Sequence, residues 1–174
     1  MSINFKPRVG QLLVCHFGDY PSPPVVGGVH GRLPPEMVKQ RLVVVLNAKH
    51  PQACVVVPLS ATQHVPSVTR GFHVPIPAGT LPPLNYWDDC DRWVKCDTIQ
   101  MVSNDRLDRV LSKRGHAAVH LTHEEVTRVQ KAVIRVIGGA GTFLAAPAND
   151  AAPPTLEPAP QETTKSDSSA EVSA

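Results

Sequence analysis

The stretch Trp93-Val94-Lys95-Cys96-Asp97-Thr98-Ile99-Gln100 combines the pattern of a buried strand with two charged side chains. Successive side chains of a strand alternate between its two faces, so Lys95 and Asp97 are predicted to project from one face and Cys96 from the other. Charge is costly to bury and is rarely buried for packing alone. We therefore expect a central strand over residues 93–100 whose charged pair forms either a functional site or a structural ion pair.

Two apolar runs upstream have polar residues at their ends. Arg41 opens the run 42–46, and Ser60 and Thr62 follow the run 55–59. Runs this rich in valine favour strands. A cation and a hydroxyl at the ends of neighbouring strands are groups that a site on a small β-scaffold would need. The structural alternative is that Arg41 forms a surface ion pair and that Ser60 and Thr62 satisfy backbone groups of a turn.

The remaining pattern predicts a mainly β domain that ends in one helix. Strands are expected at residues 11–17, 41–47, 54–59, 72–76, 93–100 and 117–121, with a hairpin between the second and third and a turn or short helix at 103–111. Thr122-His123-Glu124-Glu125 is a capping box. The helix that it opens has valines at helical spacing and is stopped by Gly138-Gly139. We interpret this valine stripe as core.

Charge and composition divide the chain into two parts. Residues 141–174 hold five acidic residues and one lysine, a formal charge of −4, which leaves +6 on residues 1–140 of a chain whose net charge is +2. The tail is rich in Ala, Pro and Ser, so we expect it to be disordered and solvating, or alternatively to compete with RNA for a basic surface. A basic domain suits a polyanionic partner, although the same charge also aids solubility.

The cysteines and the N-terminus bear on the cellular compartment and on metal binding. The four cysteines form no Cys-x-x-Cys pair, and we expect them to be reduced and structural rather than disulfide-bonded or zinc-bound. No metal site and no cofactor are predicted. The sequence shows neither an apolar run long enough to span a membrane nor the apolar centre of a secretory signal. The expected compartment is the cytoplasm.

Two long connecting segments carry side chains of the kinds that bind nucleic acid. Residues 18–39 contain many prolines and glycines together with His30 and Arg32, and loops of this length are often functional. Residues 77–91 contain Trp87, which either stacks on bases or anchors its loop on the domain.

Four blocks then occur in order: Arg8-Val9-Gly10-Gln11-Leu12-Leu13-Val14, Arg41-Leu42-Val43-Val44-Val45-Leu46, Val56-Val57-Pro58-Leu59-Ser60, and Val94-Lys95-Cys96-Asp97-Thr98-Ile99 with a later Asp105-Arg106-Leu107. Their order and spacing resemble the PemK/MazF family of toxin endoribonucleases, over residues 1–140. The corresponding family blocks are Gly-Asp/Glu-Ile-Val, Arg-Pro-Val-Val-Val, Val-x-Pro-Leu/Val-Thr, and Val-Arg-Cys-Asp-Gln-Ile with a later Arg-Leu. The resemblance implies an SH3-like small β-barrel.

The resemblance also implies roles for individual residues in cleaving single-stranded RNA without a metal. Arg41 would clamp the phosphate, and Ser60 would bind it where the family has Thr. Asp97 would act as the general base or fix the orientation of the base, and Lys95 would donate a proton or stabilise charge. The expected product is a 2′,3′-cyclic phosphate. The expected RNA-binding residues are His30, Arg32, Thr62 and Trp87, with His30 also a candidate acid or base.

The resemblance further implies a homodimer, a cognate antitoxin that inhibits the toxin, and contact with operator DNA only through that antitoxin. Besides Ser60, which replaces Thr and keeps the hydroxyl, the sequence departs from the family pattern at four positions. Leu42 replaces Pro, Lys95 replaces Arg, and Thr98 and Gln100 replace Gln and Arg. These departures keep open a second hypothesis, a catalytically inactive SH3-like barrel that binds RNA or a protein partner.

Overall fold

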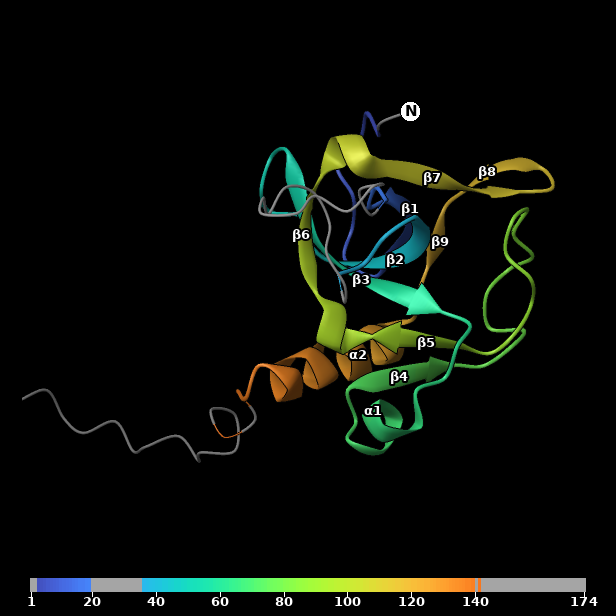
Figure 1. Cartoon of the computed structure of the whole chain (residues 1–174). Helices are drawn as coiled ribbons and strands as arrows, with labels where there is room; N and C mark the ends of the chain where they lie inside the picture. Colours follow the sequence, from blue (N-terminus) through green and yellow to red (C-terminus); the bar gives the residue numbers. More distant parts are fainter. Residues whose placement is uncertain (1–2, 20–35, 140, 142–174) are drawn as a thin grey trace, which may run out of the picture. The chain divides into compact units, whose positions relative to one another are not determined.

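The computed structural model describes residues 3–19, 36–139 and 141 (Figure 1). The expected acidic tail, apart from Gly141, lies outside the described residues, as do His30 and Arg32 in the expected long loop. The expectations for these segments stay predictions.

The described residues form nine strands, two α-helices and two 3-10 turns. The strands are β1 (Gln11–His16), β2 (Gln40–Asn47), β3 (Ala53–Ser60), β4 (His73–Ile76), β5 (Arg92–Lys95), β6 (Gln100–Ser103), β7 (Leu107–Ser112), β8 (Gly115–Ala117) and β9 (Val119–His120). The helices are α1 (Val65–Thr69) and α2 (His123–Val136), and the 3-10 turns are η1 (Cys96–Thr98) and η2 (Asn104–Arg106).

The strands form one antiparallel sheet in the order β4-β5-β3-β2-β1-β7-β8, with β6 also paired to β3 and β9 to β1. The mainly β class with a C-terminal helix is confirmed. Within the described residues no ladder joins β4 to β8, so the expected barrel is not closed by backbone hydrogen bonds. The strand predicted at residues 72–76 corresponds to β4, which lies at one end of the strand order.

The single strand expected over residues 93–100 is wrong, and the pairing with β3 explains why. One edge of β3 pairs with two strands: Val94 of β5 lies opposite Leu59, and Gln100 of β6 lies opposite Val56. The chain therefore advances six residues while β3 advances three. The three excess residues form η1, which interrupts the strand pattern at Cys96–Thr98. Lys95 and Asp97 consequently do not alternate as residues of one strand.

The expectations for residues 103–121 are partly wrong. The turn predicted from Ser103 is present as η2, but residues 107–112 form the strand β7, which the sequence analysis missed. The last predicted strand is divided into β8 and β9, which pair with β7 and β1 respectively. The short helix α1 was also missed, because five residues that begin Val65-Pro66 carry no periodic apolar pattern.

The sheet buries apolar residues on both faces. The helix face, which α2 covers, is formed by alternate residues such as Leu12, Leu42, Val44, Val57, Leu59, Val74 and Val94. The opposite face is formed by the residues between them, such as Leu13, Cys15, Val43, Val45, Cys54 and Val56, with Ile3, Phe5 and Met37 packed against it. This double burial explains why the strands read as continuous valine-rich runs rather than as alternating ones.

Helix α2 follows the predicted capping box closely. The Thr122 side chain accepts a hydrogen bond from the Glu125 backbone N–H, and the Glu125 carboxylate accepts one from the Thr122 backbone N–H. Val126 and Val129 are buried in the core of the helix face, as the stripe predicted. Figure 1 shows α2 running beside β4 and β5. Within the described part of the chain, no helix is long and apolar enough to cross a membrane.

Candidate functional site

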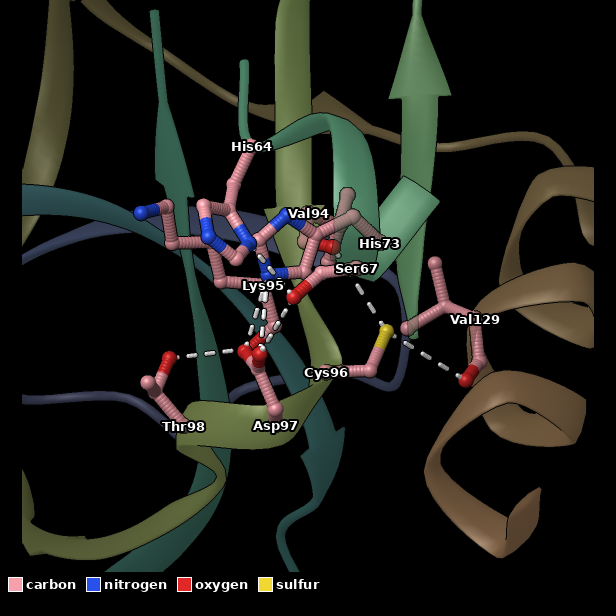
Figure 2. Close-up of polar contacts among 9 residues, drawn as sticks. All are labelled: His64, Ser67, His73, Val94, Lys95, Cys96, Asp97, Thr98 and Val129. Carbon is pink, nitrogen blue, oxygen red and sulfur yellow. Dashed lines mark hydrogen bonds and ion pairs between the residues drawn. The ribbon is translucent and has the colours of Figure 1, made fainter. Parts of the chain in front are cut away.

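The turn η1 sets the direction of Asp97. The preceding Cys96 is fully buried, and its thiol donates to the carbonyl oxygen of Val129 in α2 at 3.8 Å. The Thr98 hydroxyl donates to the Lys95 carbonyl oxygen at 2.9 Å and closes the turn. With Cys96 held against α2, the next side chain, Asp97, projects away from the helix (Figure 2). Burial, together with the neighbouring Asp97 charge, raises the pKa of the Cys96 thiol to about 12.

Asp97 is bound by a histidine of the edge strand. The Nε2 atom of His73 lies 3.0 Å from both carboxylate oxygens of Asp97. The His73 side chain is 2% exposed and that of Asp97 is 31% exposed. A carboxylate only accepts hydrogen bonds, so Nε2 carries the proton and donates it. The buried Nδ1 atom of His73 has no hydrogen-bond partner among the described residues, which fits a neutral ring with a lone pair at that position.

Two further residues extend this contact. Ser67 in α1 is buried, and its hydroxyl donates to Oδ2 of Asp97 at 3.3 Å. The Nδ1 atom of His64, the residue that precedes α1, lies 2.8 Å from the Ser67 oxygen. Figure 2 shows Ser67 and His73 converging on the Asp97 carboxylate, with His64 above them. We refer to His64, Ser67, Asp97 and His73 as the Asp97 cluster.

Strand register brings three candidate residues to the opposite face of the sheet. Ser60 pairs with Trp93, and His73 pairs with Lys95, so these side chains share the face that α2 does not cover. The β2–β3 ladder ends at Val43 opposite Pro58, and Arg41 lies on the same face of β2 as Val43, two residues beyond the ladder. Arg41 is half-buried and its Nε atom donates to the Val38 carbonyl oxygen at 3.3 Å. Two cations and a hydroxyl therefore lie on one face of the adjacent strands β2, β3 and β5.

The ion pair between Lys95 and Asp97, the structural alternative for these two residues, is not formed. No contact within ion-pair distance joins these two residues, both of which the structure describes, and Figure 2 shows the Lys95 side chain running away from the Asp97 carboxylate. Asp97 is paired with His73 instead. The structural reading of the charged pair is therefore wrong, and the Lys95 ammonium stays available to another anion.

Residues 29–137 match the family model of the "PemK-like, MazF-like toxin of type II toxin-antitoxin system". The chain belongs to this toxin family. The match covers more than half of the chain and includes the Asp97 cluster, Arg41, Ser60 and Lys95. The resemblance to this family is thereby confirmed, and the matched residues include the second, third and fourth sequence blocks.

Two relatives match most of the toxin. The uncharacterized protein YifN of Escherichia coli (strain K12) is 46% identical over 142 residues, which cover 79% of this chain and 95% of YifN. An uncharacterized protein of Haemophilus influenzae is 36% identical over 132 residues, which cover 76% of this chain and 90% of that protein.

Solved structures of the same class are also similar to this toxin. The Mycobacterium tuberculosis toxin MazF-mt6 aligns with a TM-score of 0.44 and 19% identity, covering 59% of this chain and 91% of that chain. A mycobacterial endoribonuclease in complex with its cognate antitoxin aligns with a TM-score of 0.42 and 16% identity, covering 76% and 95%.

The other sequence-predicted residues of this PemK/MazF toxin are more dispersed. Thr62 is exposed, and its backbone N–H donates to the Ser60 hydroxyl at 3.1 Å, so Ser60 also organises the turn after β3. Trp87 packs against the core of the helix face, with the Arg92 guanidinium 5.7 Å from its ring centroid. These contacts favour the loop-anchoring interpretation of Trp87.

Sequence reasoning missed His64, Ser67 and His73. The alternation in Phe72-His73-Val74-Pro75-Ile76 separates His73 from the apolar Val74 and Ile76, which is a weak signal of a polar face. That His73 meets Asp97 depends on the pairing of β4 with β5, and that Ser67 meets it depends on α1. Neither long-range contact is encoded in a local motif.

Proposed function

We propose that this PemK/MazF toxin is a metal-independent endoribonuclease that cleaves single-stranded RNA and thereby inhibits translation and growth. Family membership supports the class of activity. The observation that carries the proposal is the placement of Arg41, Ser60 and Lys95 on one face of the adjacent strands β2, β3 and β5, the face that α2 leaves uncovered. Two cations and a hydroxyl donor are the groups that bind a phosphodiester.

The proposed reaction uses the RNA's own 2′-hydroxyl as the nucleophile. The 2′-oxygen attacks the adjacent phosphorus, a 2′,3′-cyclic phosphate forms, and the bond to the 5′-oxygen of the next nucleotide breaks. Arg41 would stabilise the charge on the phosphorane oxygens, and Ser60 would hydrogen-bond one of them. The Lys95 ammonium would protonate or stabilise the leaving 5′-oxygen.

Asp97 was expected to be either the general base or the residue that orients the base. Both of its oxygens accept from His73, and Oδ2 also accepts from Ser67. Most of its accepting capacity is therefore used within the protein, which favours the orienting role. Thr62, together with His30 and Arg32 of the long connection, remains a proposed contact to the rest of the RNA strand, whereas the contacts of Trp87 favour its role as a loop anchor.

The proposal includes the assembly expected for the family. The toxin would form a homodimer in the cytoplasm, bind a cognate antitoxin that blocks the RNA site, and contact operator DNA only through that antitoxin. The excess positive charge of residues 1–140 would strengthen binding to RNA at low salt.

The test is induced expression in a bacterial host of the wild type, Arg41→Ala and the control Arg114→Ala. Arg114 lies exposed in the turn between β7 and β8. Its replacement by alanine changes the net charge by the same amount as Arg41→Ala and leaves the proposed site intact. We expect growth arrest and discrete new RNA ends with the wild type and the control, and neither with Arg41→Ala. Purified wild type should cut the mapped sequence in EDTA, and a 2′-deoxy nucleotide at the cut site should block cleavage.

Normal growth and intact RNA with folded wild-type protein would reject the nuclease. If that protein still bound RNA in a salt-dependent manner, the inactive binding barrel would be the better description. The presence of Lys95 in place of the family's Arg, which removes a bidentate phosphate contact, would then explain the lack of cleavage.

A further inference from the structure

Counting donors and acceptors fixes the direction of the hydrogen bonds in the Asp97 cluster. The Ser67 hydroxyl has one hydrogen, and it points to Oδ2 of Asp97. The Ser67 oxygen can then only accept from Nδ1 of His64, 2.8 Å away. Nδ1 of His64 therefore carries a proton, and in the neutral ring the lone pair is on Nε2. A neutral imidazole nitrogen with a lone pair is a proton acceptor.

Exposure distinguishes His64 from its partners. Ser67 and His73 are 7% and 4% exposed, whereas His64 belongs to the exposed residues. Its ring lies beside that of His73, with 6.1 Å between the ring centroids. No described residue hydrogen-bonds its Nε2 atom. Of the two imidazoles in the cluster, only that of His64 presents a lone pair to the solvent.

The location of His64 relates it to the proposed phosphate site. It follows Ser60 by four residues, across the turn that the Ser60 hydroxyl organises. Its neighbour His73 pairs with Lys95 across the β4–β5 ladder. In the strand order β3-β5-β4, His73 therefore lies beside Lys95 and on the far side of it from Ser60, and the His64 ring lies beside that of His73.

We infer that His64 is the general base of this toxin, and that Ser67, Asp97 and His73 are the residues that position it. The inference rests on the proposed endoribonuclease function. In the first step Nε2 of His64 accepts the proton of the 2′-hydroxyl as the 2′-oxygen attacks phosphorus. The bond from phosphorus to the 5′-oxygen breaks, and Lys95 or water supplies the proton that the leaving oxygen takes up. The step as written requires neither an oxidant nor a metal.

The cluster supports the charge that this step creates. When His64 gains a proton it becomes an imidazolium, whose Nδ1–H still donates to Ser67, which in turn donates to the Asp97 carboxylate. His73 holds that carboxylate in place through two contacts of 3.0 Å. Because His73 contributes a neutral N–H, the negative charge of Asp97 is left to stabilise the imidazolium.

The first experiment measures single-turnover cleavage of an oligoribonucleotide that contains the mapped cut site. We expect His64→Ala to slow cleavage by about 10²–10⁴-fold, the range of general acid–base catalysis. Added imidazole should restore part of the rate. Binding of the same RNA with a 2′-methoxy group at the cut site should not weaken. The control is His50→Ala, an exposed histidine in the turn at the other end of β3, which should cleave as the wild type does.

The second experiment separates positioning from simple packing. We expect Ser67→Ala, checked for folding by circular dichroism, to slow cleavage about tenfold, the effect of one orienting hydrogen bond. Nitrogen-15 NMR of histidine-labelled protein should show the Nδ1–H tautomer for His64 in the wild type and a mixture of tautomers in Ser67→Ala.

The outcomes separate this inference from the proposed function. If the wild type cleaves RNA, Arg41→Ala does not, and His64→Ala is as fast as the wild type, the inference is overturned and the endoribonuclease stands. A wild-type His64 that carries its proton on Nε2 would also overturn it. If the folded wild type does not cleave RNA, the proposed function fails and the inference fails with it.

Discussion

Replacing Gly10 by alanine is expected to destabilise the protein for two separable reasons. Gly10 is buried just before β1 and has a φ of +81°, in the left-handed region that costs an L-residue about 1–2 kcal/mol. A Cβ atom at this position would also lie 2.7 Å from Cγ2 of Val126, in the first turn of α2. Overpacking of this kind typically costs about 1–3 kcal/mol. The expected total is about 2–5 kcal/mol.

Gly79 provides a matched control for the backbone contribution. Its φ of +78° is nearly the same, but a Cβ atom there would meet nothing within 4 Å. Gly79→Ala should therefore cost only about 1–2 kcal/mol. The difference between the two variants measures the clash with Val126, which reports how closely α2 packs against the start of β1.

A double variant tests the same contact from the other side. Val126→Ala alone should cost about 2 kcal/mol, because two buried methyl groups are lost. In the Gly10→Ala background it also removes the clash, so the double variant should be more stable than the sum of the single effects by about 1–3 kcal/mol.

The assay is urea unfolding followed by tryptophan fluorescence, with the free energy of unfolding extrapolated to water and the slope compared between variants. Equal losses for Gly10→Ala and Gly79→Ala would show that α2 does not press on Gly10. Additive effects of Gly10→Ala and Val126→Ala would refute the clash even if the single variant were unstable.

Two further predictions concern α2 and η1. Thr122→Ala removes the N-cap of α2 and should lower the free energy of unfolding by about 1 kcal/mol, measured by the same assay, whereas Thr69→Ala, an exposed threonine of α1, should have little effect. Burial raises the pKa of Cys96 from 9.0 to about 12, so the folded state binds this proton more tightly and its contribution to stability is lost as pH rises above 9. Relative to Cys96→Ala, the wild type should lose about 1 kcal/mol between pH 9 and pH 10; parallel pH profiles of the two proteins would contradict this.

The strands β1 to β3 and the helix α2 were predictable because their signals are local. Valine-rich runs identify the strands, and Thr122 with Glu125 identifies the start of the helix. The break at η1 was not predictable. Cys96-Asp97-Thr98 has the composition of a strand, and it loops out only because β5 and β6 share one edge of β3 with a three-residue offset. That offset is a property of the pairing, not of the segment.

The same distinction applies to the candidate site. Asp97 could be singled out from sequence because a carboxylate in an apolar segment is unusual. Its partners could not, because His73 reaches it through the β4–β5 ladder and Ser67 through a helix of five residues. The expected partner Lys95 was excluded once η1 broke the alternation on which that expectation depended.

The two faces of the sheet suggest how stability and chemistry are divided. Cys96 and Asp97 are adjacent in η1, yet Cys96 is held against Val129 of α2 while Asp97 binds His73. Substitutions on the helix face should therefore change the free energy of unfolding first and activity only through the placement of η1. Substitutions of Arg41, Ser60, Lys95 or His64 should change RNA cleavage with little loss of stability, because these residues lie at strand ends or in exposed turns rather than in the core. The test is to measure both the free energy of unfolding and the rate of RNA cleavage for one set of variants that covers both faces. A barrel without a catalytic face would show only changes in the free energy of unfolding.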